Sequence, residues 1–263
     1  MKDHVFAVLA YKESPYLKEC LDSLFKQSRL SEIIICTSTP SAFLEKISTD
    51  HGLKLFINPN RSGIAADWNF ALEKAEGHYV TLAHQDDLYH PHYTQTVMEA
   101  AARNPEALII YTDYAEIVHK GSTKKIRFYS LNFLTKKILG ELGFWGRERL
   151  RGNKNRLLFL GNPIGCPAVT YCKKNLPEFS FDPNFKVDLD WKAWYDLGQR
   201  DGSFAWLRKK LVFHRIHLDS ETSQGLKDHT RQAEDLQMFA NFWPRPLAKL
   251  LSNFYALSYR NNK

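Results

Sequence analysis

A strand-like run that ends in two adjacent acids is the feature that most constrains how this chain can fold. Residues 78–83 are typical of a buried β-strand, and His84, Gln85, Asp86 and Asp87 follow it directly. Carboxylates beside a core are costly unless a positive charge meets them there. A divalent cation that carries a phosphorylated ligand supplies such a charge, because Mg²⁺ and Mn²⁺ bind carboxylate and phosphate oxygens. The alternative is a helix N-cap, in which the acids accept backbone N–H groups.

Strand and helix patterns alternate through the first half of the chain. Ser14 and Pro15 predict the start of the first helix, as N-cap and first helical residue. The order predicts an α/β fold with a mostly parallel sheet, whose loops gather at the carboxyl edge and bind a nucleotide-sized ligand there. The strand-like runs occupy residues 5–9, 33–36, 53–57, 78–83 and 108–111, and the helical stripes occupy residues 17–25, 43–47, 65–75 and 93–103.

The composition narrows the class of protein. With 263 residues, of which 44% are hydrophobic and 25% charged, the chain can form one large or two interlocked soluble domains. It contains neither a membrane span nor a signal peptide, so we expect a cytoplasmic protein. No Gly-rich phosphate loop separates the first strand from the first helix, which disfavours dinucleotide dehydrogenases and P-loop NTPases. The four scattered cysteines are expected to be buried thiols, not zinc ligands or disulfides: Cys20, Cys36, Cys166 and Cys172.

Several short motifs carry a joint resemblance, because their order and spacing agree. They lie at residues 10–13, 17–24, 63–72 and 84–87, and then at Gly165-Cys166-Pro167, residues 188–191 and Arg215-Ile216-His217. Together they resemble family 2 glycosyltransferases of the GT-A fold over about residues 4 to 223. The resemblance implies a Rossmann-like sheet flanked by helices, with a C-terminal acceptor-side part. It also implies transfer of a sugar from a nucleotide donor to an acceptor, with inversion at the anomeric carbon.

The resemblance also implies roles for individual residues. Asp86 is the metal-binding acid of the DxD-like motif, with His217 as a second contact to Mn²⁺ or Mg²⁺. Asp190 is the general base that takes the proton of the acceptor hydroxyl, and we expect it at the N-terminus of a helix. Donor-binding residues carried over by position are Ala10, Tyr11, Glu13, Ser38, Arg61, Asp67, Gln85, Asp86 and Arg215.

This chain departs from the family pattern at two positions. His84 stands where the DxD-like motif has its first Asp, so its contact with ribose or with metal-bound water is an open question. Thr37 and Ser38 replace the Asp that the family often uses on the nucleobase. Hydroxyl or backbone groups are therefore expected to bind the base, and a UDP-sugar is the expected donor.

Each assignment has a structural alternative. Asp87 either orients its loop or touches ligand. Asp190 and Asp188 could both be capping or surface acids, and the resemblance favours Asp190 over Asp188 as the base. His217 and Arg215 reach the metal or diphosphate, or else form structural contacts such as a salt bridge. Arg61 contacts phosphate or base, or is a solvated loop cation. Trp68 is expected in the core, beside an Asp67 that could reach the nucleoside.

The second half of the chain concerns the acceptor. We divide the chain into residues 1–115 (donor half), 116–160 (basic insertion), 161–225 (acceptor and base half) and 226–263 (helical tail). Residues 120–156 contain eleven Lys or Arg among regularly spaced apolar residues, against Glu141 and Glu148, and contribute to a net charge of +7. Three alternatives stay open for this segment: it lies on an anionic membrane, packs on the domain, or closes over the donor as a lid. Three also stay open for the tail: it docks on the body, pairs with a second copy, or touches membrane.

The sequence therefore predicts a metal-dependent inverting glycosyltransferase of surface polysaccharide or glycolipid assembly. Its expected partners are a nucleotide sugar, a saccharide or lipid-linked acceptor and peripheral membrane, and not nucleic acid. Two alternatives stay open. The basic charge and interleaved aromatic residues would suit a non-catalytic sugar-nucleotide or nucleic-acid binding module, and acids with a metal on an α/β sheet would suit a nucleotidyltransferase.

Overall fold

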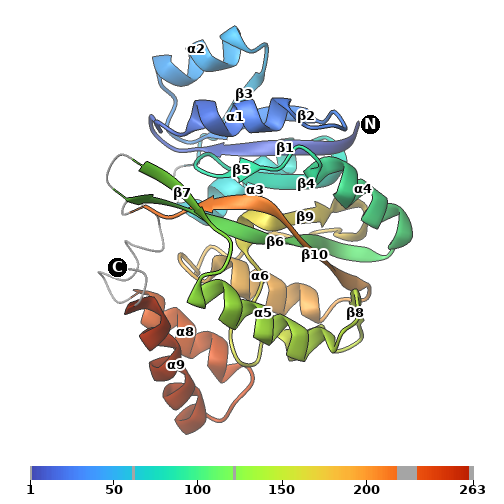
Figure 1. Cartoon of the computed structure of the whole chain (residues 1–263), viewed down its shortest axis with the longest axis vertical. Helices are drawn as coiled ribbons and strands as arrows, with labels where there is room; N and C mark the ends of the chain where they lie inside the picture. Colours follow the sequence, from blue (N-terminus) through green and yellow to red (C-terminus); the bar gives the residue numbers. More distant parts are fainter. Residues whose placement is uncertain (1, 61–62, 121–122, 218–229, 261–263) are drawn as a thin grey trace.

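The fold is an α/β structure built on one large mixed sheet (Figure 1). The computed structural model describes residues 2–60, 63–120, 123–217 and 230–260. The first half contains β1 (Lys2–Ala10), α1 (Leu17–Phe25), β2 (Glu32–Thr37), α2 (Ala42–Asp50), β3 (Lys54–Ile57), α3 (Ile64–Lys74), β4 (Gly77–His84), β5 (Leu88–Tyr89), α4 (Tyr93–Arg103) and β6 (Ala107–Lys120). The second half contains β7 (Thr123–Arg127), α5 (Leu131–Phe144), β8 (Arg149–Arg151), β9 (Val169–Cys172), α6 (Leu189–Gly198), β10 (Ser203–Arg215), α8 (Thr230–Ala240) and α9 (Arg245–Arg260).

The sheet runs in the order β3-β2-β1-β4-β9-β6-β10-β5, with β7 on β6 and β8 on β10. Strands β1 to β4 pair in parallel, as the strand–helix alternation predicts, and β6 pairs with β10 in parallel. Strand β9 is antiparallel to both of its neighbours, β4 and β6. The α/β fold class is confirmed, and the sheet is parallel in its first half and mixed in its second.

Both faces of the first strands are buried, which explains their continuous apolar sequence. Val5 and Ala7 contribute to the cluster that contains α3 and α6, whereas Phe6 and Val8 contribute to the cluster that contains α1 and α4. Trp68 is 6% exposed, which confirms that it belongs to the core. The alternation along β1 therefore joins two helix layers across one sheet.

Local sequence signals predicted most boundaries within a few residues, but the first helix starts later than predicted. Helix α1 begins at Leu17, and its N-cap residue Tyr16 makes no side-chain cap. The Ser14 hydroxyl instead accepts the N–H of Tyr16 at 3.2 Å, in a turn before the helix. The N-cap assignment of Ser14 was therefore wrong, because its side chain bonds within the loop.

The cysteines are free thiols, as predicted. Cys20, Cys36 and Cys172 are buried and Cys166 is half-buried. Burial raises the pKa of the Cys36 and Cys172 thiols to about 12, so neither ionises near neutrality.

Helices α8 and α9 pack beside α5 and α6 at the end of the molecule far from α2 (Figure 1). Ala248 of α9 is fully buried, and the Tyr255 ring lies 5.5 Å from Trp191 and 5.6 Å from Phe239. Of the alternatives for the tail, docking on the body is therefore observed. Among the helices of the described residues, we find none with the length and apolar character that a membrane span requires.

Candidate active site

The loops after β1, β2 and β4 meet at one edge of the sheet, because these strands are parallel and in register. Leu9 is paired with His84, and Ala10 with Thr37. The amide of Gln85 then closes two bonds with the backbone of Tyr11, accepting its N–H at 3.1 Å and donating to its carbonyl at 2.9 Å. Gln85 thus ties the first and fourth strand ends together, and the Tyr11 ring stays half exposed beside this tie.

A second group of polar side chains surrounds Asp67 on the same edge. Its carboxylate accepts the Ser38 hydroxyl at 2.8 Å and the Asn58 amide at 2.9 Å. Ser38 is 4% exposed, so its hydroxyl is fixed by this bond. Asp67 and Ser38 were both predicted to bind donor, and the structure brings them into direct contact.

The remaining residues that were predicted to bind the donor differ in how far they are buried. Ala10 is buried at the end of β1, and Glu13 is exposed in the following loop. Arg61 lies outside the described residues.

Asp86 and His217 form a hydrogen-bonded pair at the carboxyl edge. The His217 Nε2 atom lies 2.7 Å from an Asp86 carboxylate oxygen, although 131 residues separate them in the chain. Burial by itself disfavours the charged carboxylate, but the His217 bond and the nearby His84 and His214 outweigh it and lower the Asp86 pKa to about 2. Asp86 is therefore ionised across the physiological range.

Asp87 points into the protein and holds the end of β10. It is fully buried, and it accepts the backbone N–H of Arg215 at 2.8 Å and a bond from His214 Nδ1 at 3.0 Å. Burial favours neutral His214, but the Asp87 charge outweighs burial and raises the His214 pKa to about 9. These bonds match the loop-orienting alternative for Asp87.

Arg215 forms a salt bridge, which was the structural alternative to a contact with metal or diphosphate. Its side chain is 1% exposed, and its guanidinium donates to the Asp86 carbonyl at 2.8 Å and to Glu19 at 2.6 Å. The guanidinium also lies 4.3 Å from the Tyr16 ring. Arg215 therefore fixes the backbone of the Asp86 turn against α1.

Ligand atoms of His84, Asp86 and Asp87 lie within 4.8 Å of one another. The His84 Nε2 atom is buried and has no hydrogen-bond partner among the residues that the structure describes. A buried unpaired imidazole nitrogen beside an ionised carboxylate fits a cation ligand. Because the Asp87 oxygens are already occupied by β10, the residues that fit a cation best are His84 and Asp86, with His217 alongside.

On the acceptor side, Asp190 lies in the first turn of α6, as predicted. One carboxylate oxygen accepts the Asn162 amide at 3.0 Å, and the other accepts the Trp191 backbone N–H at 2.7 Å. Burial raises the Asp190 pKa, while the charge of Lys136 opposes the shift. An acid of raised pKa whose carboxylate is held by two donors suits proton transfer.

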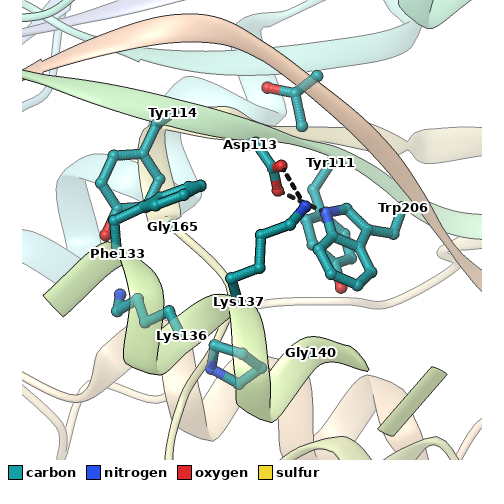
Figure 2. A pocket seen from close by; sticks show the side chains of 11 residues that line it. Tyr111, Asp113, Tyr114, Phe133, Lys136, Lys137, Gly140, Gly165 and Trp206 are labelled. Atoms are coloured by element: carbon teal, nitrogen blue, oxygen red, sulfur yellow. Dashed lines mark hydrogen bonds and ion pairs between the residues drawn. The ribbon is translucent and has the colours of Figure 1, made fainter. Parts of the chain in front are cut away.

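The inner face of α5 is directed toward β6 and β10, with Phe133 and Lys137 pointing at these strands (Figure 2). Asp113 of β6 accepts both the Lys137 ammonium and the Trp206 indole N–H at 2.8 Å, while Lys136 lines the same small cavity of about 10 Å³ near Gly165. A Cβ atom on Gly165 would lie 2.9 Å from the Tyr114 ring, so only glycine fits there.

The Gly165-Cys166-Pro167 motif is the next predicted family motif. Burial raises the pKa of the Cys166 thiol, and the charges of Asp190 and Asp87 raise it further. The Pro167 carbonyl accepts the Tyr89 hydroxyl at 2.8 Å. This motif is therefore bonded to β5, the strand that follows Asp87.

Sequence patterns missed the residues that hold the Asp190 segment. The Glu234 carboxylate of α8 accepts the backbone N–H groups of Lys186, Val187 and Asp188, each at 2.7–2.8 Å. Asp188 is 3% exposed and its side chain makes no cap bond at the start of α6, so the prediction of a capping or surface acid was wrong. Burial and the neighbouring Asp235 raise its pKa. No sequence motif marks Glu234, Asn162 or Lys136 as part of the site. Only their contacts in the folded structure identify them as site residues.

Comparisons with known proteins agree with this geometry. A sequence model described as Glycosyl transferase family 2 matches residues 6–175. An uncharacterized glycosyltransferase of Rickettsia typhi is 22% identical over 232 residues, which are 86% of this chain and 67% of that protein. The UDP-Glc:alpha-D-GlcNAc-diphosphoundecaprenol beta-1,3-glucosyltransferase WfgD of Escherichia coli is 23% identical over 267 residues, covering 98% of this chain and 93% of that protein.

Solved structures share the fold. The S. aureus TarS fragment 1–349 in complex with UDP-GlcNAc superimposes with a TM-score of 0.61 at 15% identity, over 95% of this chain and 70% of that one. The mannosyltransferase PcManGT from Pyrobaculum calidifontis, in complex with GDP-Man and Mn²⁺, gives a TM-score of 0.63 at 15% identity, over 97% and 69%. At this identity the similarity concerns the fold alone.

Proposed function

Since this chain belongs to glycosyl transferase family 2, as its motifs indicated, we propose that it transfers a sugar with inversion from a UDP-sugar to a lipid-linked saccharide. The glycosyltransferase class itself is shown by the family match and excludes the non-catalytic module and the nucleotidyltransferase. The lipid-linked acceptor is supported by the E. coli relative, whose name specifies a diphosphoundecaprenol acceptor. We place the reaction in surface polysaccharide or glycolipid assembly at the cytoplasmic face of a membrane.

The observation that carries this proposal is the contrast between two acids of the site, Asp86 and Asp190. Asp86 is held ionised at the strand edge, and Asp190 is held with a raised pKa at the start of α6. Two carboxyl groups whose surroundings push their pKa values apart serve different roles. We assign cation binding to Asp86 and proton transfer to Asp190.

Asp86, His84 and His217 would hold the divalent cation. An imidazole ligand favours Mn²⁺ over Mg²⁺, which takes oxygen ligands. When bound, the cation would neutralise negative charge that develops on the departing nucleoside diphosphate. Arg215 keeps the Asp86 turn in place through the Asp86 carbonyl.

The chain's own residues then act on donor and acceptor. Ser38 and Asp67, with Tyr11 and the backbone near Ala10, form the nucleoside end of the site, and Glu13 and Arg61 complete the donor set as a proposal from position alone. Asp190 accepts the acceptor hydroxyl proton as that hydroxyl attacks, while the Asn162 amide and the Trp191 N–H orient its carboxylate.

The proposal is tested in two stages. A thermal-shift screen of UDP-, GDP- and dTDP-sugars, each with and without Mn²⁺, should give the largest stabilisation with a UDP-sugar and Mn²⁺. Release of nucleoside diphosphate is then measured with a short-chain lipid diphosphate that carries one sugar. Stabilisation by a GDP-sugar alone would overturn the assignment of a UDP-sugar as donor. Turnover that is unchanged by chelation and by added Mn²⁺ would overturn the proposed metal dependence.

A further inference from the structure

The outer face of α5 carries an apolar stripe of four side chains. Leu134 is 44% exposed, Ile138 62%, Leu142 55% and Trp145, which follows the helix, 82%. The spacing of four residues places Leu134, Ile138 and Leu142 within about a quarter of the helix circumference, at roughly 100° per residue. Trp145 is the C-cap residue, in the left-handed conformation, and continues the exposed apolar sequence beyond the helix. We call these four residues the α5 stripe.

The α5 stripe is not needed to attach the helix to the domain. The opposite face of α5 already buries Phe133, Gly140 and Phe144 against β6 and β10. None of the four stripe residues belongs to the two apolar clusters formed by the described residues. A contiguous exposed stripe of this kind marks an interaction surface.

Basic residues flank the stripe at both ends. The exposed cations are Lys124, Lys125 and Arg127 of β7 before the helix, and Arg147, Arg149 and Arg151 after it. Glu148 is the exposed acid of the same segments. Four of these cations form ion pairs: Lys124 with Glu19, Arg127 with Glu116, and both Arg149 and Arg151 with Glu106. Lys125 and Arg147 lie outside these ion pairs.

An apolar stripe between basic ends, with a Trp at one end, has the chemistry of a helix that lies in the interface of an anionic bilayer. A second copy of the chain is the weaker candidate, because two-fold pairing of the stripes would bring the basic ends of both copies together. The helix is also short and packed on its other face, so the contact is peripheral.

We propose that the α5 stripe docks this protein on an anionic lipid surface. This proposal deepens the proposed function. The reason for docking, which is access to a lipid-linked acceptor, rests on that function. The inner face of the same helix carries Lys136, whose charge acts on Asp190. A helix that touches lipid on one face and the acceptor side on the other would present a lipid-linked saccharide to the proposed base.

Vesicle binding tests the proposal without any turnover. The full chain is sedimented with vesicles of phosphatidylcholine alone and of phosphatidylcholine with 30% phosphatidylglycerol, at low and high salt. We expect binding to the anionic vesicles that weakens with salt. The combined variant Ile138→Ser, Leu142→Ser and Trp145→Asn should reduce the partition coefficient about tenfold or more, because three exposed apolar side chains no longer enter the interface.

The matched control is Phe25→Ser with Leu30→Ser. Phe25 is the last residue of α1 and is 41% exposed, and Leu30, in the loop before β2, is 85% exposed. Helix α1 lies far from α5 (Figure 1), so the loss of these side chains should leave vesicle binding unchanged. Thermal melting of both variants confirms that they fold. Equal binding by the α5 variant and the wild type would overturn the proposal. So would a wild type that stays in the supernatant and forms a dimer that the α5 variant loses.

The two proposals can fail separately. The α5 variant should retain transfer to a short-chain soluble acceptor and lose transfer to the same saccharide on a long-chain lipid in vesicles. If the wild type binds vesicles but turns over no nucleotide sugar, the proposed function fails and the docking surface stands. Equal loss with both acceptors would overturn the role of α5 in docking.

Discussion

The donor side and the acceptor side of this site are built in different ways. On the donor side, parallel strands end in register, so residues that follow each strand meet without further help, as Tyr11 and Gln85 do. On the acceptor side, Asp190 starts a helix that other segments must hold, through Asn162 and through Glu234 of α8. The donor side therefore depends on the sheet, and the acceptor side depends on contacts between distant segments.

The same side-chain type also behaves differently on the two sides. Asp86 has several histidines beside it, and its pKa is lowered to about 2 despite burial. Asp190 has one amide, one backbone N–H and the charges of Lys136 and Arg231, which do not outweigh burial, so its pKa is raised. The comparison teaches that the partners of a buried carboxyl, and not burial alone, decide between a permanent charge and an exchangeable proton.

The largest expected effect concerns the acceptor side. Asp190→Asn removes the proton acceptor while keeping the shape and one of the two bonds that Asp190 accepts from Asn162 and Trp191, so kcat should fall by about 10²–10⁴-fold. The dissociation constant of the nucleotide sugar, measured by calorimetry, should stay the same. Wild-type transfer by this variant would remove Asp190 as the base.

Asp86→Asn tests the donor side in the same way. We expect kcat/KM to fall by about 10²–10³-fold, because the charge that holds the cation is lost. In contrast to the Asp190 variant, the Mn²⁺-dependent affinity for nucleotide should fall as well. If nucleotide binding keeps its full Mn²⁺ dependence, the cation is held elsewhere.

Glu234→Gln tests whether the acceptor side depends on α8. A neutral amide can accept fewer of the three N–H bonds and places an N–H₂ group against the others, so unfolding free energy should fall by about 1–3 kcal/mol. Chemical denaturation measures this, and Glu99→Gln at an exposed position of α4 serves as the control. A variant as stable as the wild type would show that the Glu234 contacts are not needed.

The smallest effect is a shift in pH dependence. Asp190 must be ionised to act as base, so kcat/KM should rise with pH through its raised pKa. Lys136 favours the ionised form, and Lys136→Met should therefore move this acidic limb to higher pH. Lys137→Met, whose ammonium bonds Asp113 instead, is the control and should leave the limb in place. An unchanged limb in the Lys136 variant would exclude this electrostatic coupling.

Local patterns predicted the strand–helix order of the first half, because a strand covered on both faces is apolar throughout and an amphipathic helix repeats its apolar residues. They also placed Asp190 in the first turn of a helix, which the structure confirms. They did not predict that β9 lies antiparallel between β4 and β6, because side chains alternate in the same way in parallel and antiparallel strands, so the pattern carries no direction.

The sequence by itself determined which residues stand at strand ends and helix starts, since these positions follow from spacing along the chain. Only the tertiary structure decided their partners, such as His217 with Asp86, Arg215 with Glu19 and Glu234 with residues 186–188. Those contacts join segments far apart in sequence, and the pKa of each acid depends on them. The same holds for α5, whose sequence shows an amphipathic helix but whose packing alone decides which apolar side chains remain exposed.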